Sequence, residues 1–107
     1  MGKLIYGAPT WSVEFDDREL AHLRIVITTK LRRGESFSLT WTSDPGTGGG
    51  RSSLWLHQAI PLQFIFSGSE EPALNRLWVE ALMAKANSGM GLELVPEPQP
   101  ESRADAK

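Results

Sequence analysis

The stretch D-D-R-E-L-A-H-L-R-I-V-I-T-T-K-L-R-R-G, residues 16–34, decides how the rest of this chain is interpreted. Asp16 offers an N-cap oxygen, and Glu19 stands three residues later, where a capping box needs it. Apolar residues then follow at the spacing of one helical face: Leu20, Leu23, Ile27 and Leu31. The β-branched run 25–29 would also suit a strand, because such residues lose side-chain freedom in a helix. The cap, the stripe and the glycine at the end agree with one another, so the sequence predicts a helix to about Arg33.

Short segments on both sides of this helix have the pattern of strands. They are residues 3–7, 11–15, 35–42, 53–57, 62–66 and 92–94. The clearest is 35–42, in which Phe37, Leu39 and Trp41 share one face and serines and threonines share the other. The period of two predicts a half-buried strand there.

A second helix is expected before the last of these strands. Ser69 or Glu71 is predicted to cap it, with Pro72 in its first turn, where the missing amide donor is tolerated. Its core-facing residues would be Leu74, Leu77, Trp78, Ala81 and Leu82. The turn formed by residues 87–89, which contains a glycine, is expected to end this helix.

The predicted elements follow the order ββαβββαβ, and short connections between strands favour antiparallel pairing. We therefore expect an α+β fold with a single small domain over residues 1–95. It would have a mostly antiparallel sheet of five to six strands, with both helices on one face. Residues 96–107 contain three prolines and no large apolar side chain. Such a segment cannot bury enough surface to offset its ordering entropy, so we expect a disordered tail.

Composition excludes several classes of protein. The 107 residues include no cysteine, which removes disulfide scaffolds, thiolate nucleophiles and cysteine-ligated zinc. The net charge of −2 counts against a general coating of nucleic acid, which requires a broad basic surface. No segment has the length of a signal-peptide core or of a membrane span. We therefore expect a cytoplasmic protein that does not contact a membrane.

The stretch D-P-G-T-G-G-G-R-S-S, residues 44–53, is the part of the chain most like a phosphate-binding loop. A P-loop needs a glycine five positions before its Gly-Lys pair and a helix after it. Here Pro45 takes the place of the first glycine, Arg51 replaces the lysine, and a predicted strand follows. We interpret the stretch as a loop between two antiparallel strands, with Arg51 as a candidate anion contact.

The first of the two histidines lies within the predicted first helix. Glu19 and His22 have the E-x-x-H spacing of di-iron carboxylate sites, which require two such pairs and two further glutamates. Only one pair is present. We therefore expect both side chains on the solvent side of the helix.

The second histidine belongs to the most interesting candidate surface. If Leu54 and Leu56 face the core, strand alternation places Trp55 and His57 on the opposite face. The small polar residues of the preceding strand, Ser38 and Thr40 among them, would share that face. This surface could stack a base or receive a partner strand. Two alternatives remain: Trp55 is buried under a loop, or the register is reversed, since both Leu54 and Trp55 are apolar.

Basic residues gather at the end of the first predicted helix. Lys30, Arg32 and Arg33, together with Arg51, are the candidate basic patch for nucleic acid. A basic helix end also suits the helix macrodipole. No G-x-S-x-G elbow is present, and Asp16 with its acidic neighbour is better used as a helix cap than as a catalytic pair. The sequence therefore indicates no catalytic residue, no cofactor and no metal.

Four stretches of the chain occur together in a known group of proteins. They are M-G-K-L-I-Y-G at residues 1–7, F-D-D-R-E-L-A-H-L-R-I-V-I-T-T-K-L-R-R-G-E-S-F-S-L-T-W at 15–41, G-R-S-S-L-W-L-H-Q-A-I-P-L-Q-F at 50–64 and N-R-L-W-V-E-A-L at 75–82. On these stretches the chain resembles short actinobacterial proteins of unknown function, many of them labelled "ATP-dependent DNA ligase". The resemblance spans residue 1 to about residue 96 and implies no catalytic or binding residues.

The sequence around each lysine tests whether the ligase label fits this chain. A nucleotidyl-transferring ligase forms its adenylated intermediate on a lysine in a K-x-D-G setting, and none of the four lysines of this chain has that setting. We therefore expect a chain that is not a complete ligase. The function that the sequence favours is a small non-enzymatic binding or regulatory module that engages a protein partner or a copy of itself. The alternative is a nucleic-acid-binding accessory module.

Overall fold

The structure of the protein, a computed structural model, describes residues 1–8, 11–42 and 50–98. Within these residues the elements are β1 (Gly2–Tyr6), β2 (Ser12–Phe15), α1 (Asp17–Arg32), β3 (Phe37–Thr42), β4 (Arg51–Leu56), β5 (Leu62–Ile65), α2 (Arg76–Ala86) and β6 (Leu92–Glu93). The predicted α+β class and the predicted order of elements are confirmed. Most of the glycine-rich stretch and the end of the expected tail, residues 99–107, lie outside the described residues.

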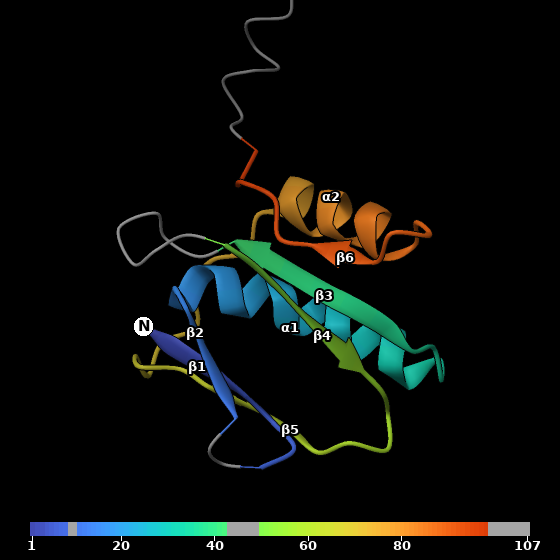
Figure 1. The fold of residues 1–107 in the computed structure, drawn as a ribbon. Coiled ribbons are helices and arrows are strands. Elements are labelled where there is room, and N and C mark those ends of the chain that lie inside the picture. Colours follow the sequence, from blue (N-terminus) through green and yellow to red (C-terminus); the bar gives the residue numbers. More distant parts are fainter. Residues whose placement is uncertain (9–10, 43–49, 99–107) are drawn as a thin grey trace, which may run out of the picture.

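The strands form two three-stranded sheets, whereas the sequence suggested one (Figure 1). The first sheet has the order β2-β1-β5 and is antiparallel throughout. The second has the order β4-β3-β6, in which β3 and β4 are antiparallel and β3 and β6 are parallel. Helix α1, of 16 residues and about 24 Å in length, connects β2 of the first sheet to β3 of the second.

Helix α1 begins with the capping box that the sequence predicts. The Asp16 carboxylate accepts a hydrogen bond from Arg18 N at 3.1 Å, and Glu19 Oε1 accepts one from Asp16 N at 3.2 Å. The β-branched run is helical because Val26 and Ile27 are fully buried. Burial of such a side chain contributes about 1.5–3 kcal/mol, which outweighs a propensity loss of about 0.7 kcal/mol per residue.

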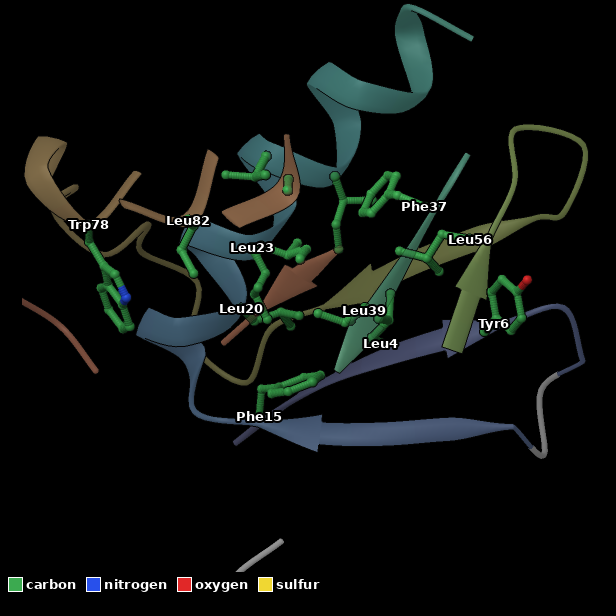
Figure 2. Close-up of a cluster of buried hydrophobic side chains, with 14 residues drawn as sticks. Leu4, Tyr6, Phe15, Leu20, Leu23, Phe37, Leu39, Leu56, Trp78 and Leu82 are labelled. Carbon is green, nitrogen blue, oxygen red and sulfur yellow. The ribbon is translucent and has the colours of Figure 1, made fainter. Parts of the chain in front are cut away.

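One hydrophobic core lies between the two sheets and the helices (Figure 2). Its buried members are Leu4, Tyr6, Phe15, Leu20, Leu23, Val26, Ile27, Phe37, Leu39, Leu56, Trp78, Leu82, Ala86 and Leu92. Phe37 and Leu39 of β3 point into this core, and the half-buried Trp41 meets Phe15 edge-on with ring centroids 5.8 Å apart. The predicted division of β3 into an apolar and a polar face is confirmed.

Helix α2 begins later than the sequence predicts. Its N-cap is Asn75, whose Oδ1 accepts a hydrogen bond from Leu77 N at 3.0 Å. The predicted caps, Ser69 and Glu71, lie before the helix, and Leu74 is 57% exposed instead of buried. Trp78 and Leu82 do face the core, so the second half of the predicted stripe is confirmed.

Contacts with α1 explain the late start of α2. Asp17 of α1 accepts hydrogen bonds from Ser67 N, Ser67 Oγ and Gly68 N at 2.9–3.2 Å, and these bonds lower the pKa of its carboxyl group. Arg18 donates to the Ala73 carbonyl. Ser67 also accepts a hydrogen bond from the Met1 ammonium at 3.2 Å. The segment between β5 and α2 is therefore held along the first turn of α1. These contacts outweigh the local preference of the sequence to begin a helix at Ser69 or Glu71.

The segment after β6 is held against both helices. Trp78 Nε1 donates to the Val95 carbonyl at 2.9 Å. Arg18 makes a bidentate pair with Glu97, at 2.9 Å from Nε and 2.6 Å from Nη2. Asn75 Nδ2 donates to the Pro98 carbonyl at 3.1 Å. Contacts with the domain thus extend past residue 95, where the sequence placed the start of the tail.

Neither helix in the described part of the chain has the length and apolar character needed to cross a lipid bilayer.

Candidate functional site

The polar face of the second sheet carries four of the candidate residues: Ser38, Thr40, Arg51 and Trp55. Cross-strand partners on this face are Ser38 with Trp55, Thr40 with Ser53 and Thr42 with Arg51, and Glu93 of β6 lies beside Thr40. We call these seven residues the outer face. They alternate with Phe37, Leu39 and Leu56, which are buried. The two predicted residues Ser38 and Thr40 therefore lie on the same face as Trp55.

Trp55 is the dominant side chain of the outer face. It is 59% exposed, while its neighbour Leu56 is fully buried. Both alternatives, a Trp55 buried under a loop and a reversed register, are therefore wrong. Around the indole, Thr40 Oγ1 and Ser53 Oγ lie 2.7 Å apart and hydrogen-bond to each other. The outer face therefore combines one large aromatic ring with small hydroxyl side chains on the neighbouring positions.

A polar pocket of about 360 Å³ lies beside Trp55, between β3 and the turn after α2. Its lining includes Ser38, Asn87 and Gly91. Gly91 has φ +87°, and a Cβ there would lie 2.4 Å from Ser38 Oγ, so only glycine allows the turn to approach β3 this closely. The close approach brings the turn to the border of the outer face.

His57 lies just beyond the end of β4, in the turn that leads to β5. Its Nδ1 accepts a hydrogen bond from Ala59 N at 2.9 Å, and its carbonyl accepts one from Ile60 N at 3.0 Å. The imidazole is half-buried. These contacts make His57 part of the turn as well as a neighbour of Trp55.

The candidate basic patch is not one surface. Lys30 is only 7% exposed, and its Nζ lies 2.7 Å from Glu35 Oε1 and 2.8 Å from Asn87 Oδ1. The ammonium also lies 5.9 Å from the centroid of the Phe37 ring. Its hydrogen bond to Glu35 lowers the pKa of that carboxyl group. Lys30 therefore joins α1 to β3 and to α2, and is not available to a phosphate backbone.

The three arginines of the predicted patch are also divided. Arg32 and Arg33 are exposed at the end of α1. Arg51 begins β4 and pairs with Thr42, at the end of β3 that lies away from the C-terminal end of α1. Five residue steps along a strand span about 17 Å, which separates Arg51 from the last residue of β4, Leu56. The structure keeps Arg32 with Arg33 and places Arg51 on the outer face.

His22 is buried, and the expectation of a solvent-facing Glu19 and His22 pair is wrong for the histidine. Its ring is 0% exposed and lies against Trp78, with centroids 4.5 Å apart. Nδ1 lies 2.7 Å from the Arg18 carbonyl, and Nε2 accepts a hydrogen bond from Asn75 N at 2.8 Å. A carbonyl oxygen only accepts, so Nδ1 is the donor in this contact.

A metal site at this histidine has no structural support. Among residues 1–8, 11–42 and 50–98, no three histidine, aspartate or glutamate side chains are grouped so that they could hold a metal ion. The two ring nitrogens of His22 are both engaged with backbone groups. His22 is thus a packing residue that joins α1 to the start of α2.

A family model described as a domain of unknown function, DUF7882, matches residues 1–97. The chain belongs to this family. The match to DUF7882 includes all eight elements and ends at Glu97, the residue that pairs with Arg18. Comparison with curated proteins and with solved structures found no match.

Proposed function

We propose that this domain is a non-enzymatic binding module that engages a separate protein partner through the outer face, with Trp55 as the central contact. The exposed indole of Trp55 is the observation that supports this proposal. A tryptophan contributes a large contact area at a low cost in side-chain entropy, and such residues are enriched among the hot spots of protein interfaces. The hydroxyl groups around it supply hydrogen-bonding capacity without a strong charge.

The charges of the outer face favour a partner with an acidic group. Glu93 lies 3.6 Å from Lys85 in an ion pair. Arg51 has no ion-pair partner within the part of the chain that the structure describes. An acidic side chain of a partner would complement Arg51, while an apolar side chain would cover Trp55.

A nucleic-acid partner has weaker support. Of the basic residues that motivated that alternative, Lys30 is buried in an ion pair, and Arg51 lies apart from Arg32 and Arg33. The exposed charge that remains at the end of α1 is small compared with the surfaces that bind phosphate backbones.

An affinity capture with matched variants tests the proposed function. The wild-type domain, Trp55→Ala and Leu74→Ala would be used as baits in native lysate, and retained proteins would be quantified by mass spectrometry. Leu74 is the control, because it is also a large exposed apolar side chain but lies on another surface. The partner would then be purified, and its dissociation constant measured for all three baits.

We expect a partner whose affinity falls by about tenfold or more for Trp55→Ala, as for a hot spot, and changes little for Leu74→Ala. Equal affinity of the partner for wild type and Trp55→Ala would contradict the proposal. A concentration-dependent dimer that Trp55→Ala abolishes would replace the separate partner with a second copy of this chain.

A further inference from the structure

Strand β4 forms one edge of its sheet, and the direction of its backbone groups can be derived from its neighbour (Figure 1). The Thr40 carbonyl of β3 accepts a hydrogen bond from Leu94 N at 3.1 Å, so it points toward β6 and away from β4. In an antiparallel ladder the N–H and C=O of one residue point to the same side. Thr40 and Ser53 are therefore a non-hydrogen-bonded pair, and the backbone groups of Ser53 point to the free edge.

A second contact leads independently to the same assignment. The Tyr6 hydroxyl donates to the Trp55 carbonyl, which must therefore point away from β3. Ser53 and Trp55 are two residues apart in the strand, so their backbone N–H and C=O groups point to the same side. The backbone groups of Arg51, two residues before Ser53, point to that side as well. The free edge of β4 thus presents the backbone groups of Arg51 and Ser53, with the Trp55 carbonyl occupied by Tyr6.

Apart from the Tyr6 contact at the Trp55 carbonyl, the edge of β4 lacks the usual protection against strand pairing. Natural edges are protected by proline, by inward charges or by short length. Strand β6 has two residues, β2 has four and carries Glu14, and β5 is preceded by Pro61. Strand β4 has six residues with no proline and no acidic side chain, and its one charge is Arg51 at the end. Among the described strand edges, β4 is the one best suited to receive a further strand.

We infer that the partner adds an extended strand to the free edge of β4 and carries an acidic residue and a large apolar residue four positions apart. The inference rests on the proposed function and specifies how the partner binds. Arg51 and Trp55 lie on the same face of β4, four residues and about 13 Å apart. A strand paired with β4 places its own residues opposite them at the same spacing. The carboxylate then faces Arg51, and the apolar side chain covers Trp55.

A designed peptide is the probe for this inference. It is a synthetic chain of about nine residues that alternates threonine and valine and carries one aspartate and one tryptophan four positions apart. The isotope-labelled domain is titrated with it and followed by amide NMR. We expect shift changes centred on residues 51–55, and slower hydrogen exchange at the amides of Arg51 and Ser53. No change at these two amides would overturn the inference.

Two substitutions at Ser53 separate the backbone contact from the side-chain contact. Ser53→Pro removes the edge N–H, and proline is tolerated at an edge because that N–H does not pair with β3. Ser53→Ala keeps the N–H and removes the hydroxyl group. We expect peptide affinity to fall about tenfold or more for Ser53→Pro and to stay within about twofold for Ser53→Ala. Loss of the folded spectrum in Ser53→Pro would overturn the assigned backbone direction.

A charge exchange tests the acidic residue of the partner. Arg51→Glu should weaken binding of the aspartate peptide, and replacing that aspartate with lysine should restore binding to Arg51→Glu. Arg51 is exposed, so these variants retain the fold. Equal binding of both peptides by both proteins would overturn the charge complementarity.

The two proposals fail separately. If the natural partner loses affinity for Trp55→Ala but not for Ser53→Pro, the outer face binds a protein without strand addition, and this inference is wrong. If neither variant changes the affinity of the partner, the proposed function is wrong as well.

Discussion

Asn75 joins three parts of the chain through one side chain and its own amide. Its backbone N–H donates to His22 Nε2 at 2.8 Å, and its Oδ1 caps α2 at Leu77 N. Its Nδ2 donates to Glu97 Oε2 at 2.8 Å and to the Pro98 carbonyl at 3.1 Å. Each donor and acceptor of this amide therefore has a partner, which fixes α1, α2 and the last described residues relative to one another.

His22→Phe tests the polar half of this arrangement. Phenylalanine keeps a ring beside Trp78 but removes the acceptor for Asn75 N and the donor to the Arg18 carbonyl. A partly buried amide left without a partner costs about 1–3 kcal/mol, so the free energy of unfolding should fall by that amount. Urea unfolding at neutral pH measures it.

Arg24→Ala is the control for this prediction, because Arg24 lies on the same helix and is exposed. It should change the free energy of unfolding by less than about 0.5 kcal/mol. A His22→Phe protein as stable as wild type would show that these hydrogen bonds contribute little.

At the scale of elements, the two helices differ in how well local sequence predicts their starts. The cap of α1 uses Asp16 and Glu19, which are neighbours in sequence, and the prediction is confirmed. The signals at Ser69 and Glu71 are as clear, but α1 holds that segment in a non-helical path through Asp17 and Arg18. Such contacts span about fifty residues and leave no local pattern.

Two alanine variants distinguish the predicted cap of α2 from the observed one. Asn75→Ala removes the cap and the bonds to the C-terminal segment, and should lower the free energy of unfolding by about 1–2 kcal/mol. Ser69→Ala should change it by less than about 0.5 kcal/mol, because Ser69 lies outside the helix. Thermal unfolding of both variants measures the difference. A larger effect at Ser69 than at Asn75 would contradict the observed helix start.

For the candidate site, the sequence predicted only which residues share a face within one strand, and not the contacts between strands. Alternation along residues 53–57 placed Trp55 opposite the buried Leu56, which the structure confirms. The direction of the backbone groups of Ser53 required knowledge that Leu94 binds Thr40, a contact between separate strands. The same limitation applies to Lys30, which donates a hydrogen bond to Asn87, the C-cap of the distant second helix.

At the scale of the whole molecule, strand pairing joins segments that lie far apart in sequence. Strand β1 pairs with both β2 and β5, and β3 pairs with both β4 and β6. Local patterns identified the strands, but the partners are selected by which faces are buried together in the core. This is why the sequence predicted the class and the order of elements, while the division into two sheets emerged only from the structure.

The ion pair between Glu97 and Arg18 makes the free energy of unfolding depend on pH in the acidic range. Hydrogen bonds from Arg18 and from Asn75 lower the pKa of Glu97 to about 2, from an ordinary value of 4.5. Because the folded pKa is the lower one, the stabilisation is fully present above about pH 4.5 and is lost as the pH falls toward 2. Glu97→Gln should therefore be less stable than wild type at pH 7, and this difference should shrink between pH 4.5 and 2.

Urea unfolding of wild type and Glu97→Gln measures this dependence. The midpoints are compared at pH 7, at pH 4.5 and at about pH 2. The lowered pKa values of Asp17 and Glu35 affect both proteins equally and cancel in the comparison. A difference between the two proteins that does not vary with pH would mean that Glu97 titrates normally in the folded state.

The first turn of α1 also determines where a polypeptide enters and leaves the domain. Met1 reaches this turn through Ser67, which binds Asp17, and Glu97 reaches it through Arg18. A chain that enters at Met1 and passes Glu97 therefore returns to the same corner of the molecule. This geometry suits insertion into a surface loop of another protein, and it suits circular permutation, because neither requires the rest of the fold to stretch.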